Sequence, residues 1–260
     1  MSFTIEIRFL GGLTPSQEIT FAKASARWSE LIIGDLPRVQ LPNGEIIENV
    51  RIDAQAVNID GALGILGQAG PTQLRAGSFL PATGIMQFDT SDLARLEAEM
   101  SLKDVIIHEM GHVLGFGTLW SSRFLNLISG SGTGNPTFNG SNSLNEYQLL
   151  ANDQNLTSVP LANTGGEGTR DGHWRELIFA NELMTGFIDN GINPISRLSI
   201  AAFEDMGYIV DYGKADEYNL PKPSTLKALS ELNENNQCKM CSSQILRCDP
   251  IVLSKSAFID

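Results

Sequence analysis

Residues 101–115 read SLKDVIIHEMGHVLG, and residues 108–112 within them have the form H-E-x-x-H. In an α-helix, residues four positions apart are separated by one turn of rise and about 40° of rotation. The imidazoles of His108 and His112 therefore point the same way and can bind one metal ion. The pattern predicts a helix with a metal site on one of its faces.

A second face of the same segment is apolar and lies well away from the two histidines. It consists of Leu102, Ile106, Met110 and Val113. Residues with this spacing form the stripe by which a helix packs against a core. Ser101, with Asp104 three residues later, is a weak capping box at the start of the helix. We therefore expect a helix that packs on one side and binds metal on another.

Glu109 lies between the two histidines, where a carboxylate can reach a metal-bound water without being a ligand itself. Zinc lowers the pKa of its bound water to about 7, and a neighbouring carboxylate can then take the proton and deliver it to a leaving amine. A catalytic zinc site usually has three protein ligands. The chain has three histidines, so His173 is the natural third ligand. A carboxylate, Glu176 or Glu182, is the alternative.

The stretch HEMGHVLGFG, followed by a distant histidine and a methionine in NELMTG, resembles the metzincin clan of zinc endopeptidases. Gly115 matches the clan's motif glycine, which ends the helix and turns the chain back towards the metal. In the short form of the motif the third histidine follows that glycine by three residues, but here Thr118 has that position. Leishmanolysin-like peptidases carry a long insertion at this point, and DGHWREL with NELMTG resembles their pattern. The resemblance implies His173 as third ligand and Met184 as the Met-turn residue.

The resemblance also implies a fold, and it covers about residues 1–212. We expect an α+β, metzincin-like catalytic domain with a mixed twisted β-sheet, an active-site helix and a smaller, mostly irregular and helical C-terminal subdomain. Residues 1–115 would form the sheet-and-helix subdomain that ends in the zinc-binding helix. Residues 116–214 would form the subdomain with the insertion, the third ligand and the Met-turn. Residues 215–260 would be a polar, cysteine-containing tail.

Hydrophobic periodicity and turn residues predict the remaining elements. Alternating or short apolar runs indicate strands at residues 3–7, 50–59, 61–70 and 84–88. Capping residues and helical periodicity indicate helices at residues 14–33, where Thr14 precedes Pro15, at 91–100, where Ser91 is the expected cap, and at 175–183 and 195–206. Residues 129–145 consist almost entirely of Gly, Ser, Asn, Thr and Pro, a composition typical of a surface loop within the insertion.

The strand expected near residues 61–71, GALGILGQAGP, falls where metzincins have the edge strand above the substrate cleft. An exposed strand edge can bind an extended peptide through backbone hydrogen bonds. The resemblance therefore implies a polypeptide substrate in extended conformation. Some metzincins have a tyrosine two residues after the Met-turn methionine. Here that position is Gly186, so the group that assists zinc in stabilising the oxyanion stays open.

Composition excludes several classes of function. The formal net charge of -12 opposes binding to nucleic acid, and no apolar run is long enough for a membrane-spanning helix. The opening sequence MSFTIEIRFL alternates apolar and polar residues and does not have the form of a signal peptide. The compartment is therefore unknown from the sequence, while the resemblance suggests a secreted or cell-surface protein. The oligomeric state is also open.

All three cysteines, Cys238, Cys241 and Cys248, lie in the predicted tail. A structural zinc site needs four ligands, and this segment offers three cysteines and no histidine. Free or paired thiols are the simpler interpretation.

The expected function is that of a zinc-dependent endopeptidase with one catalytic ion, in which metal-activated water hydrolyses the peptide bond and Glu109 is the general base. Two alternatives stay open. One is a zinc hydrolase that acts on a non-peptide amide. The other is a non-catalytic metzincin-like binding module, and the presence of Glu109 argues against it.

Overall fold

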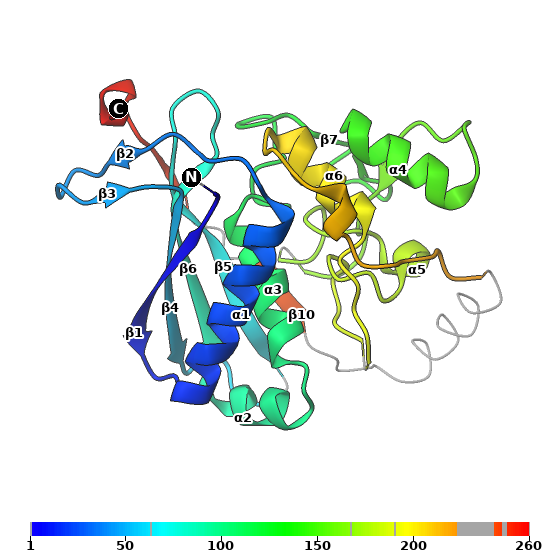
Figure 1. Ribbon diagram of the computed structural model, residues 1–260. Coiled ribbons are helices and arrows are strands. Elements are labelled where there is room, and N and C mark those ends of the chain that lie inside the picture. The colour runs from blue at the N-terminus through cyan, green and yellow to red at the C-terminus, as the bar shows by residue number, and fades with distance from the viewer. Residues whose placement is uncertain are drawn as a thin grey trace.

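A mixed β-sheet lies on one side of the protein, and helices α1 and α3 pack together on one of its faces (Figure 1). The structure is a computed structural model that describes residues 2–62, 64–166, 168–189, 191–222, 242–245 and 249–259. The sheet strands are β1 (Ile5–Gly11), β4 (Val50–Val57), β5 (Ile65–Leu74), β6 (Pro81–Asp89), β10 (Ser242–Ile245) and β11 (Ile251–Val252).

The order across this sheet is β1-β4-β6-β5-β10, and β11 also pairs with β5. Strands β1, β4 and β6 are parallel, whereas β5 runs antiparallel to β6. A parallel pair needs a crossover, which α1 (Pro15–Leu31) supplies between β1 and β4. The mixed α+β architecture agrees with the fold class expected from the sequence.

The remaining described elements are short strands, five further helices and two 3-10 turns. A hairpin joins β2 (Val39–Gln40) to β3 (Ile46–Ile47), and a small sheet contains β7 (Ile128–Ser129), β8 (Thr137–Phe138) and β9 (Val159–Pro160). The other helices are α2 (Thr90–Ala98), α3 (Leu102–Val113), α4 (Ser141–Ala151), α5 (Glu176–Phe179) and α6 (Arg197–Met206), with 3-10 turns η1 (Tyr212–Lys214) and η2 (Lys255–Ala257). None of the described helices is long and apolar enough to cross a membrane.

Local sequence explains the start of α1. Thr14 caps the helix and accepts a hydrogen bond from the Gln17 backbone, and the Gln17 side chain accepts one from the Thr14 backbone. Pro15 has the first helical position, where its missing N–H costs nothing. The buried side of the helix includes Phe21 and Trp28, which belong to the hydrophobic core shared with the sheet and with α3. The predicted helix and its N-terminal signal are confirmed.

Strand β5, expected at the edge of the sheet, is instead flanked by β10 and β11; it begins four residues later than predicted and runs further, to Leu74. The Asp60 carboxylate accepts a hydrogen bond from the Ile65 backbone, so the residues before Ile65 form a turn and not a strand. The strand continues through Pro71, which pairs with Gly84 of β6. The glycine-rich sequence predicted the existence of the strand but not its ends.

Two predicted helix caps are wrong. Helix α2 is capped by the Asp89 side chain, which accepts a hydrogen bond from the Ser91 backbone, and Ser91 itself lies within the helix. Ser101 precedes α3 in a helical conformation, and its hydroxyl donates to the Leu96 carbonyl. Because α3 follows α2 after a short turn, Ser101 bonds back to α2 and makes no side-chain cap for α3.

The prediction of a surface loop at residues 129–145 is wrong in part, because the segment contains a buried aromatic residue and the start of α4. Phe138 is fully buried, and its ring centroid lies 4.6 Å from that of Trp120 and 5.5 Å from that of Trp174. The backbone on either side pairs in the small β7-β8-β9 sheet. One large side chain thus anchors a stretch whose overall composition is polar.

The fully buried carboxylate of Asp89 holds two segments together. One oxygen accepts backbone hydrogen bonds from Ile59, Asp60 and Gly61 at 2.7–3.0 Å, and the other caps α2. Burial opposes the charged form, but the four backbone N–H groups outweigh burial and hold the pKa of Asp89 well below its usual range. This carboxylate therefore links the turn before β5 to the helix before α3.

Replacing Asp89 by Ala is expected to lower the free energy of unfolding by about 2–4 kcal/mol at pH 7, because buried N–H groups lose their acceptor. Urea denaturation measures this change in the free energy of unfolding. The Asp89→Asn variant keeps an acceptor oxygen and is expected to lose less stability than Asp89→Ala. Since the folded pKa is depressed, the charge stabilises the fold above the unfolded value of about 3.9 and ceases to do so as pH falls towards the folded pKa. The gap between wild type and Asp89→Asn should therefore narrow on acidification. An Asp89→Ala protein with the wild-type midpoint would contradict this role.

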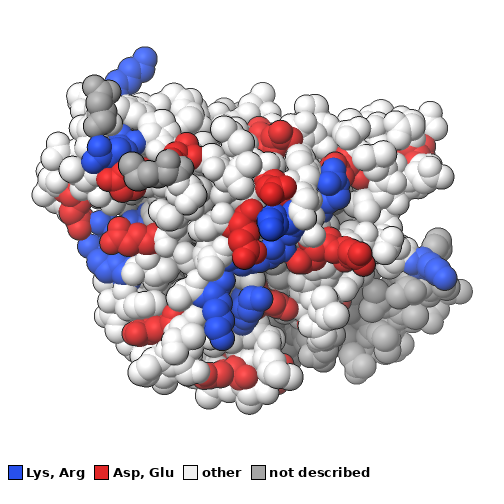
Figure 2. All heavy atoms as spheres, in the orientation of Figure 1, with Lys and Arg blue, Asp and Glu red and all other residues white. Residues whose placement is uncertain are grey.

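Acidic and basic side chains lie beside one another on the face shown in Figure 2, where Lys and Arg do not gather into a continuous patch. Oppositely charged side chains of the described residues also form ion pairs, among them Arg27 with Asp216 at 2.8 Å and Arg197 with Glu146 at 2.7 Å. This distribution agrees with the acidic net charge in offering no basic surface for nucleic acid on that face. The three cysteines of the tail lie outside the described residues.

Candidate functional site

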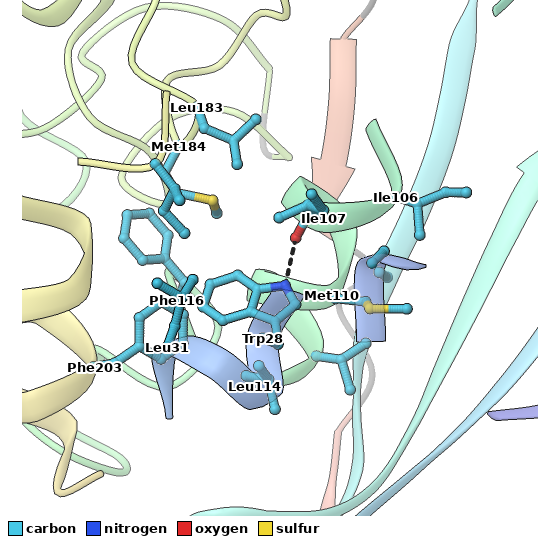
Figure 3. Packing of buried hydrophobic residues seen from close by; sticks show 14 of the residues in the cluster. Trp28, Leu31, Ile106, Ile107, Met110, Leu114, Phe116, Leu183, Met184 and Phe203 are labelled. Atoms are coloured by element: carbon cyan, nitrogen blue, oxygen red, sulfur yellow. Dashed lines mark hydrogen bonds between the residues drawn. The ribbon is translucent and has the colours of Figure 1, made fainter. Parts of the chain in front are cut away.

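Helix α3 carries both histidines of the H-E-x-x-H stretch into the interior of the protein. His108, Glu109 and His112 are all fully buried, as is the predicted packing face of the helix. Trp28 of α1 donates an indole hydrogen bond of 3.0 Å to the Ile107 carbonyl and so fastens α1 to α3 (Figure 3). The helix is thus held from several sides, which limits the freedom of its two imidazoles.

His173 meets this pair, although it lies 61 residues beyond His112. The Nε2 atoms of His108 and His112 are 2.9 Å apart, those of His112 and His173 are 3.0 Å apart, and those of His108 and His173 are 3.2 Å apart. His173 is also fully buried. The three ring nitrogens therefore form a small triangle, and within the described part of the chain it is the group of side chains arranged to hold a metal ion.

Backbone carbonyls determine which nitrogen of each ring carries the proton. Nδ1 of His108 lies 2.7 Å from the Leu183 carbonyl, Nδ1 of His112 lies 2.9 Å from that of Phe116, and Nδ1 of His173 lies 2.9 Å from that of Thr169. A carbonyl oxygen can only accept a hydrogen bond, so each Nδ1 must be the donor. In a neutral imidazole the Nε2 atom then has a free lone pair. The three lone pairs point at one another.

Burial keeps the three rings neutral. It lowers the pKa of His108 to about 4 and that of His173 to about 3, and it lowers the pKa of His112 well below its ordinary value, with the neighbouring histidines adding to the effect. Neutral imidazole is the form that binds a transition metal. The site therefore offers ligands without a proton to displace.

This arrangement fits a zinc ion. Three nitrogens about 2.0–2.1 Å from a tetrahedral zinc ion lie about 3.3–3.4 Å apart, close to the spacing of the three Nε2 atoms. Without a cation, three mutually facing lone pairs in a dry interior repel one another. Each ring is also oriented by a second hydrogen bond through Nδ1, as metal-binding histidines usually are. A cation that accepts three imidazoles satisfies all of these groups.

Two glycines explain how His173 reaches the helix. Gly117 has a φ of +71°, and a Cβ atom there would collide with the carbonyl oxygen of Gly172. The backbone after α3 therefore passes directly against the residue that precedes His173. Gly115, with a φ of +116°, turns the chain into this path. The GFG sequence contains both glycines, but only Gly115 matches the family's motif, and the close approach at Gly117 depends on the tertiary structure.

The Met184 side chain packs against helix α3, which carries His108 and His112. A Cβ atom on Gly111 would come within 2.8 Å of the Met184 Cε atom and 3.3 Å of the Trp28 ring, so only a glycine allows this approach. Figure 3 shows the Met184 side chain beside Trp28, Phe116 and Leu183. The backbone of Trp174 donates to the Met184 carbonyl at 3.0 Å, which joins the segment of the third histidine to the turn of the methionine.

Glu182, an alternative third ligand in the sequence analysis, has another position. Its carboxylate is fully buried and accepts hydrogen bonds from the Met184 backbone at 2.6 Å, from the Ser196 backbone and hydroxyl, and from the Ser199 hydroxyl at 2.6 Å. The Trp174 indole donates to the same Ser199 hydroxyl. Burial raises the pKa of Glu182, and the hydrogen bonds partly oppose this rise. Glu182 thus holds the turn of Met184 in place.

Glu176, the other alternative, is also not part of the histidine triangle. It begins the short helix α5, which spans four residues where the sequence predicted a longer helix. Burial raises its pKa to about 8, so near neutral pH the protonated form is substantially populated. A carboxyl group that holds its proton is a poor metal ligand.

Comparison with known proteins identifies the relatives of this site. The family model for leishmanolysin, a peptidase family, matches residues 60–241. This range contains the edge strand, the helix with its two histidines, the third histidine and the methionine turn.

Three curated proteins are similar to parts of the chain. A leishmanolysin homolog of Crithidia fasciculata is 25% identical over 59% of this chain and 24% of its own length. Leishmanolysin of Leishmania donovani is 27% identical over 58% of this chain and 26% of its own length. Leishmanolysin of Leishmania chagasi is 23% identical over 77% of this chain and 35% of its own length. The chain thus spans about a quarter to a third of the length of these relatives.

Proposed function

The chain belongs to the leishmanolysin family of metallopeptidases, and from this premise we propose that it is a zinc-dependent endopeptidase of the metzincin type. His108, His112 and His173 would hold one zinc ion, Glu109 would act as the general base, and Met184 and Gly115 would support the ligands. The substrate would be a polypeptide in extended conformation. We retain the division at residues 115 and 214 as part of this proposal.

The observation that carries the proposal is the convergence of three neutral imidazoles in the interior. Their Nε2 atoms lie within 3.2 Å of one another while their Nδ1 atoms are engaged by backbone carbonyls. A structural role would not require three lone pairs to face each other. Three protein ligands also leave a coordination position open, which distinguishes catalytic from structural zinc sites.

A zinc ion held there would act as a Lewis acid, polarising the scissile carbonyl and lowering the pKa of a water molecule to about 7. Glu109 follows His108 on the same helix and is fully buried. Its carboxylate would accept a proton from the attacking water and then deliver it to the leaving amine. The carbonyls of Leu183, Phe116 and Thr169 would keep the three imidazoles in one tautomer throughout.

Metal analysis and digestion together test this proposal. The purified protein is expected to contain about one zinc per chain, and casein or a peptide library is expected to be cut, with new N-termini that sequencing identifies. A chelator should abolish cleavage, and added zinc should restore it, because the three histidines would hold the ion without covalent attachment and the reaction would depend on it. Zinc without any peptide cleavage would favour a hydrolase of non-peptide amides or a binding module. Absence of zinc together with chelator-resistant cleavage would contradict the mechanism.

A further inference from the structure

The edge of the main sheet next to α3 is covered by the tail of the same chain. Strand β10 pairs with β5 in parallel register, with Ser242 opposite Ile65, Gln244 opposite Gln68 and Ile245 opposite Ala69. Strand β11 pairs with the same edge further along, with Ile251 opposite Gln73 and Val252 opposite Leu74. Both strands lie beyond residue 241, where the match to the family model ends.

The second of these strands is firmly attached. The Leu253 backbone donates a hydrogen bond of 2.8 Å to the Leu74 carbonyl, and the Leu253 side chain is buried against Val39, Leu41 and Ile47. Phe258 adds a bridge to Val39. These contacts anchor the end of the tail beside the β2-β3 hairpin, where Figure 1 shows the C-terminus. Because β11 and Leu253 are attached there, β10 stays at a high local concentration near the β5 edge even when the two strands are not paired.

The covered edge lies beside helix α3, which carries His108 and His112. Gly84 of β6 packs so closely on Val113, which follows His112, that a Cβ atom at Gly84 would collide with it. Gly84 pairs with Pro71 of β5, which places the middle of β5 level with the last turn of the metal-binding helix. Strands β10 and β11 pair with β5 on either side of this level. Figure 3 shows β10 beside the helix near Ile107.

We propose that strand β10, held near β5 by the anchored strand β11, autoinhibits the enzyme by occupying the part of the β5 edge on which an extended peptide would have to pair. The proposal rests on the proposed peptidase function. A strand edge has one row of backbone donors and acceptors, so the tail strand and a substrate strand exclude each other. The substrate would bind only in the fraction of molecules in which β10 has left β5.

Displacement of β10 is physically accessible. The paired segment is short, its register shifts between Ser242 and Gln244, and parallel pairing is slightly weaker per residue than antiparallel pairing. Pro71 lacks an N–H, so the middle of the β5 edge also offers fewer hydrogen bonds to the tail. If the open form is about one molecule in ten, the KM for a peptide is raised about tenfold while kcat is unchanged.

A double proline variant of the full chain tests this. Gln244→Pro with Ile245→Pro removes both adjacent N–H groups, one of which faces β5, and the matched variant Gln244→Ala with Ile245→Ala keeps them. For a quenched fluorescent peptide that the wild type cleaves, the proline variant is expected to show an about tenfold lower KM with unchanged kcat. The alanine variant should resemble the wild type. Unchanged KM in the proline variant overturns the proposal.

Hydrogen exchange separates this proposal from the proposed function, because it needs no activity. Amides of residues 65–69 should exchange faster in the proline variant, while those of α3 and β6 stay protected, which also shows that the variant is folded. In Glu109→Ala protein with the native tail, saturation with the same peptide should speed exchange in residues 242–245. Tail protection that does not change with peptide overturns the proposal. Absence of cleavage in every variant, with these exchange changes present, would contradict the peptidase function alone.

Discussion

Replacing Glu109 by Gln is expected to lower kcat for peptide cleavage by about 10²–10⁴-fold, with zinc content unchanged at about one per chain. Glutamine has nearly the size of glutamate but cannot accept the proton of the attacking water. Glu109 is fully buried and is not among the three side chains that converge as ligands, so the metal should stay in place. Steady-state kinetics with a cleaved peptide and metal analysis of the same preparation measure the two quantities.

The Glu109→Ala variant provides a second comparison. Truncation of a fully buried side chain leaves a cavity and costs stability, whereas the glutamine variant retains the packing. If both variants lose activity to the same extent and differ only in thermal stability, the loss is chemical. Wild-type kcat in a folded Glu109→Gln protein would remove Glu109 from the mechanism.

Replacing His173 by Ala is expected to weaken zinc binding by about 100-fold or more, because two imidazoles then remain of three. Activity should fall with occupancy. Zinc content after dialysis against a chelator of known affinity measures the effect. Since the His173 ring is buried and its Nδ1 bonds the Thr169 carbonyl, circular dichroism should accompany the measurement to show that the variant is folded.

Glu182→Gln is the matched control for His173. Glu182 was the alternative third ligand, but its oxygens accept hydrogen bonds from Met184, Ser196 and Ser199. Its glutamine variant is therefore expected to keep about one zinc per chain. The opposite pattern, with zinc retained in His173→Ala and lost in Glu182→Gln, would identify the carboxylate as the ligand.

Much of the sheet and the first helix could be predicted because their signals are local. The alternation of β1 and the capping box of α1 depend on residues that are neighbours in sequence. The caps of α2 and α3 were misassigned because Asp89 and Ser101 have partners set by the tertiary path of the chain. Phe138 was missed for the same reason: composition indicated a loop, but Trp120 and Trp174 provide a core for that one side chain.

The candidate site also has a part that local sequence predicts and a part that it does not. The i, i+4 spacing alone predicted that His108 and His112 share a face with Glu109 between them. The choice of His173 over a carboxylate came from a family resemblance, and spacing along the chain could not make it. The role of Glu182 could not be predicted from the sequence, because Ser196 and Ser199, whose hydroxyls donate to its carboxylate, lie 14 and 17 residues further along the chain.

The sequence by itself predicted a helix with two histidines on one face, an acidic residue between them, a glycine-rich strand earlier in the chain and a third histidine with no competitor of its kind. Tertiary structure decided the rest. The approach of Gly117 to Gly172 brings the third ring within 3.2 Å of the other two, and three backbone carbonyls set the tautomers. The tertiary structure also decided that the edge of β5 is paired with β10 and β11 of the chain's own tail. Pairing of strands far apart in sequence depends on which edges the fold leaves open, and periodicity along one segment carries no information about that.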